Sequence, residues 1–313
     1  MKKKSIKQLI SAIILIAIIA LFIFYIYKHI SDFKTLFNVA LSHIWLLIIV
    51  AIITLISLYL NGYLLDTLMK PFGLKLKFKE SFGLAIITNF YNMITPFRGG
   101  MAARAIYLKK KHKFPYINFL AILSAIYVII FLIAAIAGLL SMAFIWLYYG
   151  LFNLIIFLLF LAVFIFLLAI IIFSPKIKER KNIWLNRFIK VINGWHLIKN
   201  NKKVIFTTAI IAIIQLILGA IILIISYHIF GIEISFFKAL FISSIGSLSI
   251  LIAITPGNLG IGDAIFVFSA AIIGISLTEA IAATILSRAV GLIIIFILGP
   301  IFSYILLRNT NKK

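Results

Sequence analysis

Three observations predict an all-α polytopic membrane protein. Of the 313 residues, 65% are hydrophobic and 12% are charged, and the mean hydropathy is +1.24. Several apolar runs reach the ~18–20 residues that a helix needs to cross a bilayer. A Thr95-Pro96 pair followed by glycines recurs as Thr255-Pro256, each time at the end of a run too short or too polar for an ordinary span. We therefore expect a single membrane domain over residues 1–313.

About six full spans are predicted from the apolar runs. The first run follows a cluster of lysines and resembles a signal peptide, but its length and the lack of a small-residue cleavage site favour an uncleaved span. The predicted spans are 9–27, 44–65, 116–139, 151–173, 204–230 and 280–307. Two further apolar pieces, 81–96 and 239–275, contain the Thr-Pro pairs.

The net charge of +23 is concentrated between the spans. The positive-inside rule places the basic segments in the cytoplasm, and both termini with them, for a protein of the cell membrane. Of the 30 Lys and Arg residues, 26 lie in segments 1–8, 66–80, 97–115, 174–203 and 308–313. The loops 28–43, 140–150 and 231–238 are then expected outside, and 174–203 is expected to form an amphipathic helix on the inner leaflet. This distribution favours anionic headgroups as partners, and not nucleic acid.

The charge pattern also predicts two re-entrant elements. Piece 81–96 lies between two basic segments, so it should enter from the cytoplasm and turn back, while 239–275 should enter and leave from outside. The result is an inverted-topology repeat, about 44–173 and about 204–307, whose helix breaks meet near the middle of the membrane. The breaks comprise Pro96, Gly99, Gly100, Pro256, Gly257, Gly260 and Gly262. Alternatively, 81–96 and parts of 239–275 are plain spans, which gives eight or nine spans.

Two motifs carry a family resemblance. Pro96 and Arg98 begin a Pro-x-Arg-x-Gly-x-x-x-Arg motif, and Pro256 begins Pro-Gly-Asn-Leu-Gly-Ile-Gly-Asp. Together with an Arg inside the last span, they resemble the transmembrane domain of lysylphosphatidylglycerol synthase and its flippase-like, stand-alone relatives. Asn258 and Asp263 stand where that family has Gly and Glu, and Met101 stands where it commonly has an acidic residue. No aminoacyl-transferring domain follows in this sequence, so the resemblance implies movement of a lipid.

Arg288 is the most conspicuous single residue. It is the ninth residue of span 280–307, so it lies ~13 Å into the bilayer at 1.5 Å per residue. A cation at that depth must face protein or water. We expect its guanidinium to bind a substrate phosphate through two N–H groups. The alternative is a structural ion pair with Asp263 or Glu279.

Arg98 and Arg104 flank the first break and complete a candidate anion site. A helix that restarts near Ala102 would also direct its N-terminal dipole at this gap. The alternative is that both arginines contact cytoplasmic headgroups, as the neighbouring lysines do. The expected substrate-binding set is Arg98, Arg104, Arg288, Asp263, Asn92 and Asn258.

Asp263 and the asparagines each have a second interpretation. Asp263 is either an ion-coupling carboxylate at membrane depth or the N-cap of a helix that resumes at Ala264. Asn89 and Asn92 lie three residues apart on one helix face, where they either face the site or form interhelical hydrogen bonds.

No enzyme chemistry is predicted. The five histidines are scattered, cysteine is absent, and no acidic pair has catalytic spacing, so we expect no metal and no cofactor. The leading function is translocation of an anionic lipid, either a phospholipid or a polyprenyl-phosphate carrier, across the cytoplasmic membrane. The alternatives are a scaffold or subunit for a lipid-modifying glycosyl- or aminoacyl-transferase, and a membrane-embedded lipid-modifying enzyme.

Overall fold

The computed structural model describes residues 38–173, 177–178 and 183–308, and all regular elements in these ranges are helical. The chain divides into two compact units, Met1–Trp45 and Leu46–Lys313. Only residues 38–45 of the first unit are described, so the predicted span 9–27 lies outside the described residues. The second unit contains the site.

Five helices in the described ranges are long and apolar enough to cross a membrane. They correspond to the other five predicted spans, and all but α7 extend beyond the predicted bounds at one end or both, whereas α7 starts three residues later than predicted. These helices are α3 (Ile44–Met69), α6 (Tyr116–Tyr149), α7 (Leu154–Phe173), α9 (Lys202–His228) and α12 (Leu277–Arg308). The prediction of an all-helical chain with long apolar helices is therefore confirmed for this part of the protein.

Helix α6 corrects one predicted loop. Segment 140–150 was expected to be a loop, but residues 140–149 continue the helix. No Pro or Gly lies in residues 140–149, and the left-handed φ of 66° at Gly150 ends α6. At 34 residues, α6 is about 51 Å long, which exceeds the ~30 Å hydrocarbon core.

Both Thr-Pro motifs interrupt helices. The first lies between α4 (Phe78–Ile94) and α5 (Gly99–His112), with a 3₁₀ turn, η2 (Pro96–Arg98), at the break. The second follows α10 (Phe236–Leu248) and precedes α11 (Ile261–Ile272), with two 3₁₀ turns between them, η3 (Ser249–Ile252) and η4 (Pro256–Asn258). The helices therefore restart earlier than expected, at Gly99 and not Ala102, and at Ile261 and not Ala264.

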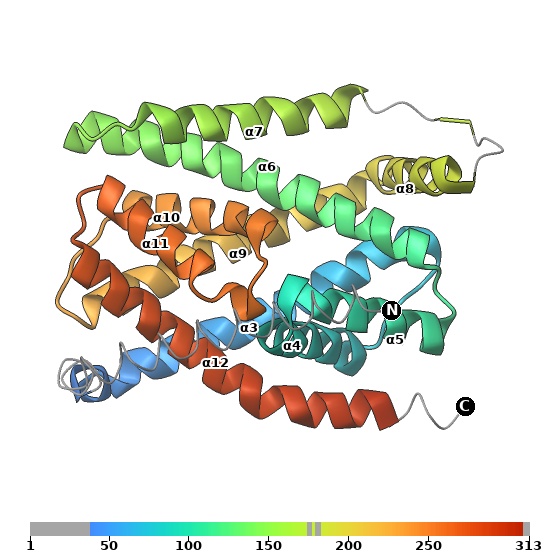
Figure 1. Ribbon diagram of the computed structural model, residues 1–313, viewed down its shortest axis with the longest axis horizontal. Helices are drawn as coiled ribbons and strands as arrows, with labels where there is room; N and C mark the ends of the chain where they lie inside the picture. The colour runs from blue at the N-terminus through green and yellow to red at the C-terminus, as the bar shows by residue number, and fades with distance from the viewer. Residues whose placement is uncertain (1–37, 174–176, 179–182, 309–313) are drawn as a thin grey trace, which may run out of the picture. The chain divides into compact units, whose positions relative to one another are not determined.

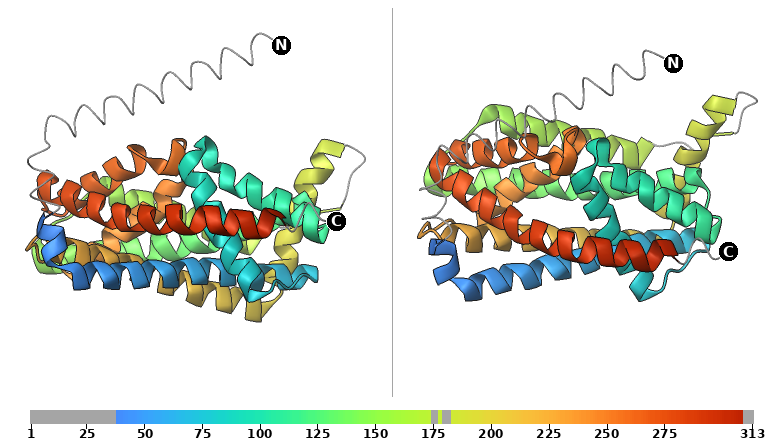
Figure 2. Two further views of the ribbon diagram at one scale, coloured as in Figure 1. Left: turned by 90° about the horizontal axis from the view of Figure 1, so that it is seen from below. Right: turned by 60° about the horizontal axis from the view of Figure 1, so that its bottom comes forward.

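Each broken element folds back on itself. Helix α4 packs against α5 across the first break, and α10 packs against α11 across the second (Figures 1 and 2). Helix α12 contacts both α4 and α11, so one long apolar helix supports both elements. Helix α8 (Ile183–Lys199), which lies between the two broken elements in the sequence, packs on α6. Each break is thus the tip of a pair of short helices.

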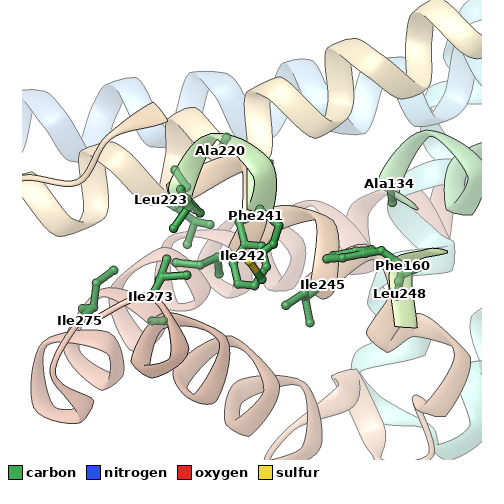
Figure 3. Packing of buried hydrophobic residues seen from close by; sticks show 14 of the residues in the cluster. Ala134, Phe160, Ala220, Leu223, Phe241, Ile242, Ile245, Leu248, Ile273 and Ile275 are labelled. Carbon is green, nitrogen blue, oxygen red and sulfur yellow. The ribbon is translucent and has the colours of Figure 1, made fainter. Parts of the chain in front are cut away.

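Two main clusters of buried side chains hold this arrangement. One lies among α6, α7, α9, α10 and the segments around α11 (Figure 3). Within it, Phe160 of α7 packs directly on Gly138 of α6 and meets the ring of Phe241 edge-on, with 6.0 Å between ring centroids. The other cluster joins α3, α4, α5, α6 and α9 around Leu65, Leu68 and Ile122. Leu64 and Ile126 of this cluster also line the pocket described below.

Candidate functional site

The first break is a tight reversal of the backbone. Thr95 is extended, and its hydroxyl donates to the carbonyl of Tyr91, the last turn of α4. Pro96 cannot continue the helix because it has no N–H to donate. Phe97 and Arg98 then both have left-handed φ values, 54° and 55°, which are uncommon for residues other than glycine. These two residues turn the chain so that α5 returns along α4.

Gly100 lets the two helices approach closely. A Cβ at this position would lie 1.9 Å from the carbonyl oxygen of Thr88, so no other residue fits without moving a helix. The Gly100 N–H donates to Asn92 Oδ1 at 3.0 Å. Asn92 therefore ties α4 to the start of α5, and its amide NH₂ group keeps its hydrogens for other partners.

The second break uses three left-handed residues. Gly257, Asn258 and Gly260 have φ values of 61°, 56° and 77°. Asparagine is enriched in this region of φ, which explains how it replaces a glycine at position 258. The hydroxyl of Thr255 donates to the Leu259 carbonyl at 2.7 Å and closes the turn.

Asp263 caps the helix that follows this break, but from a different position than expected. The N-cap residue is Gly260, and Asp263 lies at the third helical position, N3. Its Oδ2 accepts the Gly260 N–H at 2.9 Å. The cap interpretation is thus corrected in position: the carboxylate satisfies the free N–H that precedes the helix.

The two breaks are in direct contact. The Phe97 N–H of the first donates to the Ile254 carbonyl of the second at 3.0 Å. Gly257 lies against Met93, since a Cβ at Gly257 would come within 2.5 Å of the Met93 sulfur. Segments 160 residues apart in the sequence therefore form one structural centre.

Arg288 clamps the second break to α12. Its Nη1 lies 2.5 Å from Asp263 Oδ2, and its Nη2 donates to the Gly257 carbonyl at 2.8 Å. The side chains of Arg288 and Asp263 are 23% and 31% exposed, so the pair is neither fully buried nor on the open surface. Glu279, the other candidate partner, instead accepts the Ser276 N–H at 3.1 Å.

A polar pocket of about 80 Å³ lies beside the first break. Helices α3, α4, α5, α6 and α9 and the turn η3 all contribute to its wall, which combines two arginines, four side-chain amides, two hydroxyls and several apolar groups. The lining residues are Asn61, Leu64, Thr88, Asn89, Asn92, Arg98, Met101, Arg104, Ile126, Tyr127, Ile130, Gln215 and Ile250.

The two arginines of this pocket are held by neutral partners. Arg98 donates to the Tyr127 hydroxyl at 2.8 Å and lies 5.7 Å from the centre of that ring, within cation–π range. Arg104 is 2% exposed, and its Nε donates to the Thr88 hydroxyl at 2.7 Å. Neither guanidinium meets a carboxylate in the described part of the chain. The pocket therefore carries two positive charges without a counter-ion from those residues.

The predicted substrate-binding residues fall into two groups. Arg98, Arg104 and Asn92 line the pocket. The other three gather at the second break, where Arg288 binds Asp263, and Asn258 Nδ2 donates to Ser249 Oγ at 3.4 Å. Both groups adjoin the contact between the breaks.

Sequence reasoning missed four polar residues of the pocket wall: Asn61, Thr88, Tyr127 and Gln215. Asn61 and Gln215 did carry a signal, because each is an amide inside an otherwise apolar predicted span. Thr88 and Tyr127 carried none, since hydroxyl residues are common in apolar helices.

A second polar network joins the first turn of α4 to the last turn of α5, outside the five long apolar helices. Glu80 Oε1 accepts from the Tyr107 hydroxyl at 2.8 Å and lies 2.6 Å from His112 Nε2 and 3.1 Å from Lys111 Nζ. Burial raises the pKa of Glu80, but hydrogen bonds from His112, Tyr107 and Lys111 outweigh burial and leave the pKa below its usual value. The same burial and the bond to Glu80 raise the pKa of Tyr107.

Long apolar helices, together with broken helices whose tips meet beside a charged pocket, define a polytopic α-helical membrane protein. A family model described as lysylphosphatidylglycerol synthase TM region matches residues 9–299, so the chain belongs to that family, as the two motifs suggested. Searches of curated proteins and of solved structures found no match.

Proposed function

We propose that this protein translocates an anionic lipid, a phospholipid or a polyprenyl-phosphate carrier, across the cytoplasmic membrane. One observation carries the proposal: Arg98 and Arg104 line a pocket that contains no carboxylate among the described residues. Uncompensated charge in a sheltered pocket is costly and indicates a functional partner of opposite charge. In a membrane protein, the abundant anions of suitable size are lipid phosphates.

In this proposal, the two broken elements are re-entrant, enter from opposite faces and form an inverted repeat. Three features support it: each element folds back at its break, the breaks touch, and the pocket adjoins their contact. Walls from α3, α6 and α9 would let the pocket open alternately to either leaflet as the elements move.

Leaflet-resolved lipid movement in reconstituted vesicles tests this function. The purified chain is incorporated into vesicles with a fluorescent anionic lipid, and a membrane-impermeant quencher reports which leaflet holds the label. We expect Arg98→Gln and Arg104→Gln to slow movement by tenfold or more, because each removes a charge-assisted contact worth about 1.5–3 kcal/mol. Arg308→Gln, at the exposed end of α12, is the matched control. Equal rates for wild type and both pocket variants would refute the proposal.

A further inference from the structure

The charge balance of the pocket carries information about the ligand. Two guanidinium groups line it, and its other polar residues are neutral amides and hydroxyls. Three described carboxylates are paired elsewhere: Asp66 with Lys70, Glu80 with Lys111 and His112, and Asp263 with Arg288. A ligand of charge −1 would leave one of the two guanidinium groups without a counter-charge.

Asn92 and Tyr127 of the pocket wall are left as donors, whereas the Thr88 hydroxyl already donates to the Leu84 carbonyl. Asn92 Oδ1 is occupied by the Gly100 N–H, which leaves the Asn92 NH₂ group to donate. The Tyr127 oxygen accepts from Arg98, which leaves the Tyr127 O–H to donate. With the remaining guanidinium N–H groups, these donors suit a ligand that presents several acceptor oxygens.

The pocket is large enough to take a phosphate group, with a cavity of about 80 Å³. A phosphate at the end of a headgroup can present three oxygens to this space, whereas a phosphate in the middle of a headgroup presents two.

We infer that the pocket selects a terminal phosphate with two negative charges, that is, a lipid phosphomonoester in preference to a phosphodiester. This inference rests on the proposed function. Near pH 7 a phosphomonoester carries a charge of about −1.5 to −2 and three acceptor oxygens, so it can engage both arginines at once. A phosphodiester carries −1 and has substituents on two oxygens, which leaves two free acceptor oxygens and one charge for the two arginines. A headgroup with an ammonium group is disfavoured because no described carboxylate lines the pocket.

Equilibrium binding tests the preference. The purified full-length chain in detergent is titrated with dioleoyl phosphatidic acid, dioleoyl phosphatidylglycerol and dioleoyl phosphatidylethanolamine, which share their acyl chains and differ in the headgroup. Inorganic phosphate and glycerol 3-phosphate form a soluble arm. We expect phosphatidic acid to bind about tenfold or more tightly than phosphatidylglycerol, since one charge-assisted contact is gained. Phosphatidylethanolamine should bind more weakly still.

Two variants locate the preference. Arg98→Gln should reduce the ratio between phosphatidic acid and phosphatidylglycerol to about threefold or less, and Arg104→Gln should do the same where it folds. Arg308→Gln should keep the wild-type ratio.

Equal binding of the two anionic lipids by the wild type, lost in Arg98→Gln, would overturn the inference and leave the proposed function intact. Binding unaffected by Arg98→Gln would overturn both. Binding of the soluble phosphates that the lipids fail to displace would assign the pocket to a soluble ligand and also overturn both.

Discussion

The ion pair between Arg288 and Asp263 makes a quantitative prediction about stability. Removing Arg288 deletes its bond to Asp263 and its bond to the Gly257 carbonyl. Exposed pairs contribute about 0–1 kcal/mol, and breaking a buried pair costs about 3–5 kcal/mol. The exposures of 23% and 31% place this pair between those limits. We therefore expect Arg288→Ala to cost about 2–3 kcal/mol, a fall of roughly 3–5 °C in melting temperature for a chain of this size.

A double-mutant cycle isolates the pair. Asp263→Asn is the better partner substitution, because the amide oxygen can still accept the Gly260 N–H that Asp263 now accepts. Its cost of about 1–2 kcal/mol then reports mainly the lost charge. If the two residues act as a unit, the double variant should be more stable than the sum of the single effects predicts, by about 1–2 kcal/mol.

Thermal unfolding in detergent, read together with lipid movement in vesicles, checks this prediction. Arg308→Ala is the control, since this arginine is exposed on the same helix. Strictly additive losses would refute the coupling. If the double variant regains both stability and lipid movement, the pair is a structural clamp. If it regains stability alone, Arg288 also contacts the moving lipid.

Three further predictions follow from other parts of the fold. Gly100→Ala should cost about 3 kcal/mol or more in thermal unfolding, because its methyl group would overlap the α4 backbone. Gly291→Ala is the control and should be neutral or stabilising, because no neighbouring group lies within 4 Å of its new methyl group. Equal effects of the two substitutions would refute the close approach of α4 and α5. Because the pKa of Glu80 is lowered in the folded protein, its ionised side chain stabilises the fold above pH 4.5, and this stabilisation is lost as the pH falls through the folded pKa. The stabilities of wild type and Glu80→Gln should therefore differ most at neutral pH and converge in acid. A difference in stability that does not change with pH would contradict this. In intact cells, an impermeant thiol reagent should label Tyr148→Cys from outside and spare Lys178→Cys, and labelling of both would refute the inverted topology.

The breaks were predictable from the sequence because their causes are local. Proline removes a backbone donor, and glycine adopts a left-handed φ at no steric cost, so both effects follow from the identities of neighbouring residues. The restart points were misplaced by three residues, because a helix can begin as soon as the turn geometry allows. For the first break, this geometry depends on Phe97 and Arg98 taking uncommon φ values, which no residue preference would suggest.

The pocket was only partly predictable because it depends on which helix faces meet. Arg98 and Arg104 were identified because charge near an apolar segment is conspicuous. Asn61 and Gln215 lie on two different spans, and nothing in either span says that they point to the same space. For Arg288, the sequence offered Asp263 and Glu279 as partners, and the choice required the fold of the second break.

Both breaks reverse the chain with left-handed residues after a Thr-Pro pair, but they differ in whether their arginines are paired with a carboxylate. At the second break, Arg288 already forms an ion pair with Asp263 and a hydrogen bond with the Gly257 carbonyl, so its charge is balanced within the protein. At the first break, Arg98 and Arg104 are held only by neutral hydroxyls, so their charge is left for a ligand. The first break contacts the second through the hydrogen bond from the Phe97 N–H to the Ile254 carbonyl. A lipid phosphate that binds at the first break would then act on an element whose partner is already clamped, so that movement concentrates in the first element.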